Sequence, residues 1–200
     1  MEYNFVIKNF GRLLDGMIAK ELNDKALVKK INEEYKAIML RAKDIGKDNI
    51  FTTSYAMGAY YLAMVRRDNL SPKENQILLS NAISKSKVFK LFLGSADSYL
   101  SEKNMAKRKK IAKASKLHKY ENDWVWDIVD KDENYDGGYD YYECGVCKLF
   151  KDEGAFELAK YVCKLDFPMF NMIGIDLYRS KTIADGCDKC DFRFKKQSKK

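Results

Sequence analysis

The chain has 200 residues, of which 46% are hydrophobic and 33% charged, a balance typical of a folded protein with its own core and not of a disordered or collagen-like chain. The longest mostly apolar run, residues 55–65, is much shorter than the ~20 residues of a membrane-spanning helix, so no membrane partner is expected. The sequence MEYNFVIKNF lacks the features of a secretory signal, and a cytoplasmic location is expected.

The net charge of +8 is concentrated in two stretches. Half of it comes from the carboxy-terminal lysines, and residues 103–119 carry a further basic run, which precedes an acidic stretch at residues 121–143. Nucleic-acid binding requires aromatic residues interleaved with basic ones, or a second basic element that completes a groove. Neither accompanies this run. We therefore expect a solvated helix face beside an acidic hairpin, and no nucleic-acid partner.

The first 118 residues show apolar residues at spacings of three and four, which predicts helices almost throughout. Ser71-Pro72-Lys73-Glu74 matches a capping box with proline at the first helical position, so a helix should begin there. The expected helices cover about residues 5–18, 27–39, 50–67, 71–94 and 96–118.

The pattern changes after Tyr120. Trp124, Trp126 and Ile128 stand at alternate positions, as on one face of a strand, and turn residues follow before the next apolar stretch. The expected elements are strands at residues 124–129 and 139–147, a helix at 152–162 in a region closed by Pro168, a strand at 172–178, a turn at Gly186 and a strand at 190–194.

These elements predict an α+β fold, in which a helical amino-terminal half packs on a small, mostly antiparallel sheet. Their order is five helices, two strands, one helix and two strands. We expect residues 1–120 to form a helical region, residues 121–194 a cysteine-rich α+β region within the same integrated domain, and residues 195–200 a basic tail.

Five cysteines fall in the last third of the chain, at positions 144, 147, 163, 187 and 190. An odd number confined to one segment favours reduced thiols over a disulfide framework. Two C-x-x-C pairs, Cys144 with Cys147 and Cys187 with Cys190, could hold zinc or another divalent metal through four thiolates. However, 39 residues separate the pairs, whereas a zinc ribbon has about 15 to 20. Ordinary buried cysteines are the alternative.

His118 is the only histidine, and it lies in the basic run. Ser-His-Asp, Cys-His and multi-histidine metal chemistry would all depend on this one ring, which we expect to be a surface residue. No G-x-x-x-x-G-K-[ST] or G-x-G-x-x-G motif occurs, so the usual sequence support for phosphate-binding enzymes is also missing.

The remaining candidates for chemistry lie near strand ends or tight turns of the cysteine-rich region. Cys163 and Asp166 are three residues apart, just beyond a predicted helix end, where both could face one cavity. Cys190 and Asp191 are adjacent in a strand and therefore point to opposite faces. The full set is Cys144, Cys163, Asp166, Arg179, Thr182, Cys190 and Asp191, and each also has a purely structural interpretation as a buried thiol, turn carboxylate, ion-pair partner or turn hydroxyl.

Several segments resemble the L-2-amino-thiazoline-4-carboxylic acid hydrolase family: Glu143-Cys144, Tyr161-Val-Cys-Lys-Leu-Asp166, Arg179-Ser-Lys-Thr-Ile-Ala-Asp-Gly186 and Cys190-Asp-Phe-Arg193. The resemblance covers about residues 124–194, and the helical half shows no matching motif. The activity it implies is hydrolytic opening of a cyclic aminothiazoline carboxylate to N-carbamoyl-L-cysteine. Cys147 and Cys187 have no place in the family pattern.

This reaction needs a nucleophile at the amidine carbon, a proton for the departing group and a cation for the substrate carboxylate. Cys163, or a water activated by Asp166, could be the nucleophile, with Asp166 as acid and base. Arg179 could hold the carboxylate and Thr182 could orient it. Cys144 and Cys190 are further catalytic candidates, and Asp191 is a further substrate-binding one. A thiolate-bound metal that activates water is the alternative.

Two other function classes stay open at this point. Helices over a small aromatic-rich sheet could form a non-enzymatic small-molecule-binding or sensing domain. The two C-x-x-C pairs could instead stabilise a zinc-dependent interaction module that uses the basic helix. The hydrolase and the binding domain share a small molecule as partner, and no sequence feature indicates an oligomeric state.

Overall fold

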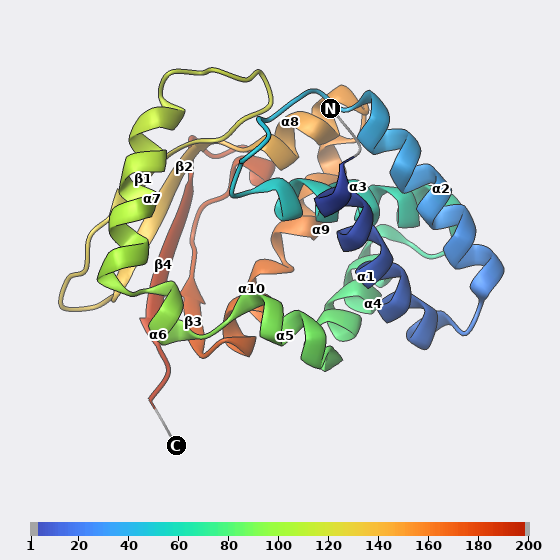
Figure 1. Ribbon diagram of the computed structural model, residues 1–200, viewed down its shortest axis with the longest axis horizontal. Coiled ribbons are helices and arrows are strands. Elements are labelled where there is room, and N and C mark those ends of the chain that lie inside the picture. Colours follow the sequence, from blue (N-terminus) through green and yellow to red (C-terminus); the bar gives the residue numbers. More distant parts are fainter. Residues whose placement is uncertain (1–3, 199–200) are drawn as a thin grey trace.

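The computed structural model describes residues 4–198, with a sheet on one side of the molecule and most of the amino-terminal helices on the other (Figure 1). Ser71 and Glu74 form the reciprocal capping box of the fourth helix, as the sequence predicts. Up to residue 115 the helices are α1 (Phe5–Leu22), α2 (Lys25–Arg41), α3 (Thr52–Arg67), α4 (Pro72–Lys85), α5 (Lys87–Leu93), α6 (Ala96–Tyr99) and α7 (Glu102–Ser115).

Two of the expected helices are each divided in two. The helix predicted over residues 71–94 breaks at Ser86, whose hydroxyl accepts a hydrogen bond from the backbone N–H of Phe89 and so begins α5. The helix predicted over residues 96–118 breaks at Ser101, which caps α7 in the same way. The predictions of single helices were wrong because serine can turn its side chain back onto the backbone and start a new helix.

The sheet confirms the predicted α+β class. Its strands are β1 (Val125–Val129), β2 (Gly137–Glu143), β3 (Ile175–Tyr178) and β4 (Cys190–Lys196), and their order is β1-β2-β4-β3 with every neighbouring pair antiparallel. The register pairs Trp126 with Tyr141 and Tyr141 with Cys190. The aromatic side chains of these strands therefore gather on the inner face, which packs towards the helices.

The segment between β2 and β3 differs most from the prediction. The strand expected over 139–147 ends at Glu143, and helix α8 (Gly145–Asp152) occupies the space where the strand should continue. The prediction of one helix over residues 152–162 is wrong as well, because α8 ends at Asp152 and no continuous helix follows it. A turn, the 3-10 helix η1 (Phe156–Leu158) and the short helices α9 (Ala159–Cys163) and α10 (Asp166–Met172) follow.

Three smaller boundaries also differ. Pro168 lies in the first turn of α10, where its missing N–H costs no hydrogen bond, and does not end a region. The strand predicted from residue 172 begins at Ile175, after Gly174 with a positive φ of 85°. The predicted tail of residues 195–200 starts inside β4, which extends to Lys196, and residues 199–200 lie outside the described part of the chain.

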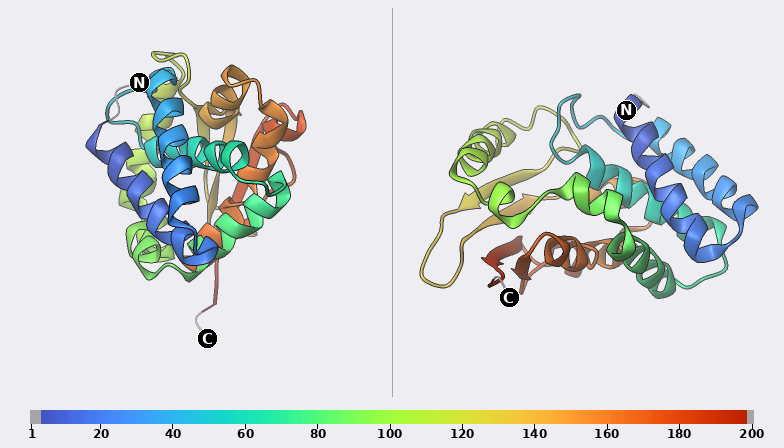
Figure 2. Two further views of the ribbon diagram at one scale, coloured as in Figure 1. Left: turned by 90° about the vertical axis from the view of Figure 1, so that its right-hand side faces the viewer. Right: turned by 60° about the horizontal axis from the view of Figure 1, so that its bottom comes forward.

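One hydrophobic core runs through the helices and the inner face of the sheet, and both views in Figure 2 show the helices α1 and α2 on the side remote from the strands. An ion-pair network reinforces the junction: the Glu153 carboxylate, beyond α8, accepts hydrogen bonds from Arg41 of α2 at 2.7 Å and Arg66 of α3 at 2.7 Å. The helical and cysteine-rich regions are therefore packed together around the same core.

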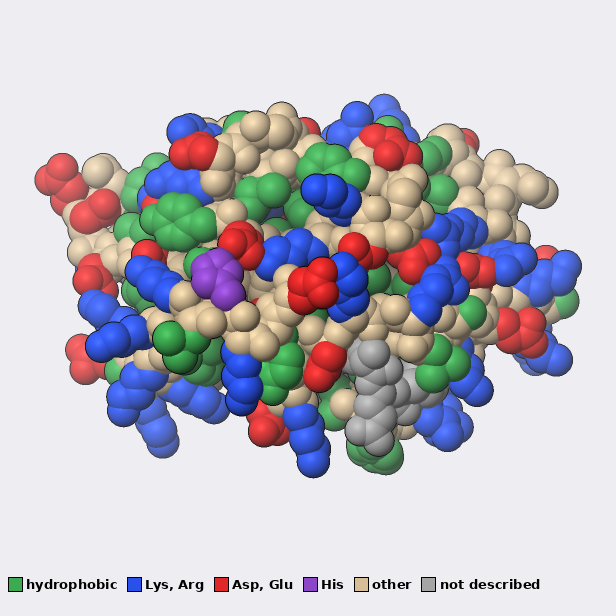
Figure 3. All heavy atoms as spheres, turned by 90° about the horizontal axis from the view of Figure 1, so that it is seen from above, with side chains coloured by type: hydrophobic (Ala, Val, Ile, Leu, Met, Phe, Trp, Pro, Cys, Tyr) green, Lys and Arg blue, Asp and Glu red, His purple; other side chains and the backbone are tan. Residues whose placement is uncertain are grey.

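The basic helix α7 packs along β1, with its outward lysines beside acidic residues as the sequence predicts. Lys109 pairs with Asp130 at 3.1 Å, and Lys116 with Asp127 at 2.8 Å. Figure 3 shows Lys, Arg, Asp and Glu side chains interleaved on the face seen from above, with no large area of one sign. His118 is exposed, as expected, and its Nδ1 lies 3.5 Å from the Glu143 carboxylate. In residues 4–198, no helix is long and apolar enough to span a membrane.

Candidate functional site

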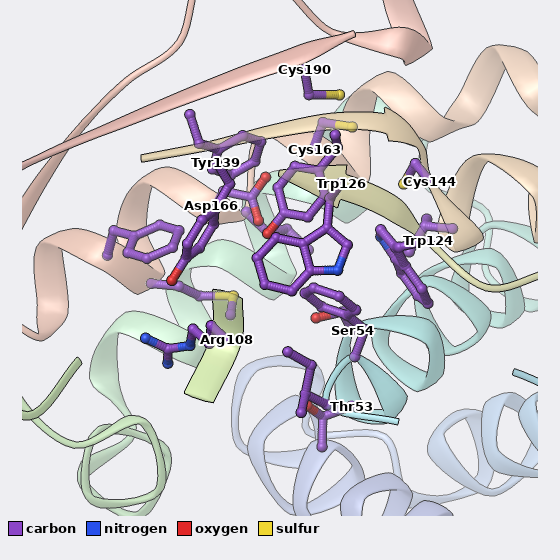
Figure 4. Close-up of a pocket in the computed structure, with 18 of the residues that line it drawn as sticks. Thr53, Ser54, Arg108, Trp124, Trp126, Tyr139, Cys144, Cys163, Asp166 and Cys190 are labelled. Carbon is purple, nitrogen blue, oxygen red and sulfur yellow. The ribbon is translucent and has the colours of Figure 1, made fainter. Parts of the chain in front are cut away.

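A cavity of about 390 Å³ lies between the inner face of the sheet and the helices (Figure 4). The sheet contributes an aromatic wall, which we define as Trp124, Trp126, Tyr139, Tyr141 and Phe192. The start of α3, one face of α7 and the α9–α10 junction contribute further lining residues, and α5, α6 and α8 contribute one each: Leu93, Tyr99 and Val146. Most of the candidate residues from the sequence meet here, because Cys144, Cys163, Asp166, Arg179 and Cys190 all border the cavity.

Cys144 occupies the junction between β2 and α8. The Cys147 thiol donates a hydrogen bond to its sulfur, and the N–H groups of Cys147 and Val146, at the start of α8, point at it as well. These donors outweigh burial and hold the pKa of the Cys144 thiol below its ordinary value. The C-x-x-C motif therefore spans the first turn of α8 and not a strand, and Cys144, the most acidic thiol of the cavity, lies at the amino-terminal end of this helix.

The other thiols near the cavity are shifted in the opposite direction. Burial, together with the nearby Cys144 and Asp166, raises the pKa of Cys163 well above its ordinary value. Burial also raises the pKa of Cys190 to about 12, although the Ile183 N–H donates to its sulfur at 3.2 Å. The pKa of Cys147 is raised because its proton is held in the hydrogen bond to Cys144. Cys144 is therefore the thiol best prepared to ionise.

Asp166 and Arg179 form an ion pair at one end of the cavity. Arg179 donates from Nη1 to the Asp166 carboxylate at 2.7 Å and from Nη2 to the Cys163 carbonyl at 2.8 Å. The guanidinium also lies between the rings of Phe167 and Phe192, 5.1 and 4.9 Å from their centroids. Burial raises the pKa of Asp166, and the neighbouring Arg179 limits this rise. Arg179 holds Asp166 in place and has little freedom left for a ligand.

Thr182 and Asp191 do not border the cavity. The Thr182 hydroxyl accepts from the Asp185 N–H at 3.1 Å and donates to its carboxylate at 2.6 Å, which caps the 3-10 helix η2 (Ile183–Asp185). Asp191 points to the opposite face of β4 from Cys190, and its carboxylate accepts from the N–H groups of Ser180 and Lys181. Both side chains brace the loop that carries Arg179.

The four cysteines of the two C-x-x-C pairs do not assemble into a metal site. Cys144 and Cys190 border the cavity, but Cys187 lies in the loop before β4 and does not line it. Throughout residues 4–198, no three His, Cys, Asp or Glu side chains are grouped so as to hold a metal ion. Cys147 interacts with Cys144 within the first pair, and the zinc alternative for the four cysteines stays a prediction.

The family model of L-2-amino-thiazoline-4-carboxylic acid hydrolase matches residues 49–194, which is most of the chain. The chain belongs to this family. The match confirms the resemblance seen in the cysteine-rich region and extends it to α3, where the sequence alone showed no motif. No curated protein and no solved structure matches this chain.

The sequence reasoning missed the part of the cavity that α7 contributes. Asn104, Lys107, Arg108 and Ile111 line it, at the spacing of three, four and seven residues that marks one face of a helix. Three of the four are polar or charged, so this face carries no apolar periodicity that would mark it as buried. Thr53 and Ser54, in the first turn of α3, were missed as well, since they lie in a stretch whose only evident signal is helical.

Proposed function

We propose that this protein is a hydrolase that opens the ring of 2-aminothiazoline-4-carboxylate, or of a closely related cyclic amidine, to give an N-carbamoyl-cysteine. One observation carries the proposal: a thiol of lowered pKa, Cys144, and a carboxyl of raised pKa, Asp166, border the same cavity. A nucleophile and an acid–base group with pKa values shifted towards their tasks are characteristic of active sites. Membership of the family supports the same reaction.

Cys144 is the nucleophile in this proposal. Cys163 was the first candidate from the sequence, but its surroundings favour the neutral thiol, whereas the start of α8 and the Cys147 thiol favour the thiolate of Cys144. In the first step the thiolate adds to carbon 2 of the ring. The Asp166 carboxylate takes the proton that Cys144 loses as its thiolate forms. The bond between carbon 2 and the ring sulfur then breaks, and the departing sulfur receives this proton from Asp166. The product of this step is an isothiourea linked to Cys144.

Water completes the reaction. The Asp166 carboxylate removes a proton from a water molecule, whose oxygen adds to the isothiourea carbon. The Cys144 thiolate then leaves, and the hydroxyl proton moves to the amidine nitrogen, which gives the urea group of the product. In the net reaction, one molecule of the cyclic substrate and one water molecule give one molecule of the ring-opened product. Arg179 acts here as a positioning residue, because it orients Asp166 and moderates the rise in its pKa.

The assay is the release of free thiol from 2-aminothiazoline-4-carboxylate by the purified protein. Cys144→Ser and Asp166→Asn should each reduce turnover by about a hundredfold or more, the scale expected for loss of a nucleophile or a positioned acid–base group. Cys187→Ser, a cysteine outside the cavity, is the matched control and should retain turnover. Folded Cys144→Ser and Asp166→Asn proteins with wild-type rates would refute these roles.

A non-catalytic small-molecule-binding domain is the second candidate, because the aromatic wall gives the cavity the apolar lining typical of ligand pockets. The same assay separates the two. A wild-type protein that binds the thiazoline in calorimetry but releases no thiol would favour the binding domain, whereas release that depends on Cys144 favours the hydrolase.

A further inference from the structure

The cavity is larger than the ring that the proposed reaction requires. A cavity of about 150 Å³ holds one benzene molecule, which corresponds to about 25 Å³ of cavity volume for each non-hydrogen atom. 2-Aminothiazoline-4-carboxylate has nine non-hydrogen atoms and therefore needs a cavity of about 225 Å³. The cavity measures about 390 Å³. The difference is about the space that one further six-membered ring occupies.

The surplus space is bounded by flat aromatic surfaces. The rings of Trp126 and Tyr141 are stacked at 5.8 Å between centroids, and Phe51, at the start of α3, lies 4.8 Å from Trp124. Figure 4 shows Thr53 and Ser54 at the end of the cavity remote from the sulfur atoms of Cys163 and Cys190, with the indole of Trp126 between. A ligand whose reacting ring lies at the thiols therefore leaves space along the aromatic wall.

The charges of the lining indicate an anionic occupant. Arg179 and Asp166 neutralise each other, so the positive charge comes from Lys107 and Arg108 on α7. Arg108 donates to the Tyr99 carbonyl at 2.5 Å and lies over the Tyr99 ring at 3.9 Å from its centroid. Within residues 4–198, Lys107 makes no ion pair, and its ammonium group is available to a ligand.

We infer that the substrate is a cyclic amidine that carries a flat apolar substituent, about the size of one six-membered ring, against the aromatic wall, and an acidic group that meets Lys107. The identity of the reacting ring rests on the proposed function. The substituent and the acidic group follow from the size, lining and charge of the cavity, and binding measurements test them independently of turnover.

Four ligands test the inference: 2-aminothiazoline-4-carboxylate, its 5-phenyl derivative, and the methyl ester of each. Calorimetry gives the dissociation constants, and thiol release gives kcat/KM. Because a buried phenyl group contributes about 1.5–3 kcal/mol of transfer free energy, the phenyl acid should bind roughly tenfold to hundredfold more tightly than the parent acid.

Two pairs of variants test where the phenyl substituent and the acidic group of the ligand bind. Ser54→Phe fills the surplus space and should abolish the preference for the phenyl derivative, while Ser54→Ala, its control, should keep it. Lys107→Gln should weaken binding of both acids roughly twofold to fivefold, the scale of an exposed ion pair, and leave both esters unchanged. Lys110→Gln, on the exposed side of α7, is the control for charge and should change neither. Melting temperatures verify that each variant is folded.

The outcomes separate the two proposals. Equal affinity for the parent and phenyl acids, or exclusion of the phenyl acid, overturns the inference and leaves the hydrolase proposal intact if the parent acid is hydrolysed. A Lys107→Gln change that weakens acids and esters alike overturns the acidic contact. Tight binding of the phenyl acid with no thiol release from any ligand supports the inferred pocket and refutes the hydrolase.

Discussion

The hydrogen bond from Cys147 to Cys144 gives the most direct test of the chemistry. Cys147→Ala removes the thiol that contributes most to the lowered pKa of Cys144 and leaves the N–H groups of α8 in place. The Cys144 thiolate should become less populated at neutral pH. The rate at which iodoacetamide alkylates Cys144 should therefore fall, since the thiolate is the reactive form.

The size of this fall follows from two opposing effects. A hydrogen bond to a charged group contributes about 1.5–3 kcal/mol, so its loss reduces the thiolate population roughly tenfold to hundredfold. A less acidic thiol is intrinsically more nucleophilic, with a Brønsted slope of about 0.4–0.5, which recovers about half of the effect on a logarithmic scale. The net expectation is a roughly threefold to tenfold slower alkylation at pH 7.

Peptide mapping by mass spectrometry assigns the alkylation rate to Cys144 separately from the other thiols. Cys147→Ser is the matched control, because its hydroxyl keeps a donor of similar size at the same position, and it should react at close to the wild-type rate. Circular dichroism verifies that both variants are folded. A Cys147→Ala protein in which Cys144 reacts as fast as in the wild type would refute the assignment of Cys144 as the activated thiol.

Three further predictions concern the scaffold. Glu153→Gln should lower the free energy of unfolding by about 1–3 kcal/mol, because it breaks a partly buried network with two arginines. Burial alone would raise the pKa of Glu153, but the two arginines lower it below 4.5 in the folded protein. The stabilisation by Glu153 should therefore be present above about pH 4.5 and be lost on acidification. Denaturant titrations of the wild type should show this contribution, and those of Glu153→Gln should lack it. Gly145→Ala should lower the melting temperature and the turnover, because the new Cβ would lie 2.5 Å from the Asn122 carbonyl oxygen. Gly16→Ala, with open space around its position in α1, is the control and should add about 0.5–1 kcal/mol to the free energy of unfolding. Equal effects of the two changes would contradict the steric argument. The double change of Lys109 and Lys110 to Glu should leave turnover within about twofold of wild type, because the ion pair that it breaks, between Lys109 and Asp130, is exposed. If the wild type bound nucleic acid in a salt-sensitive manner and this change abolished the binding, our interpretation of the basic helix would be contradicted.

Local signals in the sequence determined the fold class and much of the candidate site. The capping box at Ser71 acts within one turn of helix, and the alternation of Trp124 and Trp126 acts within one strand, so neither depends on distant residues. Cys163 and Asp166 could be placed near one another because only two residues separate them. The structure indeed places both beside the same cavity, at the end of α9 and the start of α10.

Tertiary structure alone decided what surrounds each group, and this controls its chemistry. The sequence around Cys144 suits a strand, but the Trp124 ring and the Asn122 carbonyl leave no space for a side chain at Gly145, where α8 starts. Arg179 is occupied by Asp166 and the Cys163 carbonyl, contacts that span 13 and 16 residues. The packing of α7 along β1 makes Lys107 one of the residues that line the cavity. A pKa depends on burial and on charges within a few ångströms, and neighbours from distant parts of the chain are set only when the chain folds.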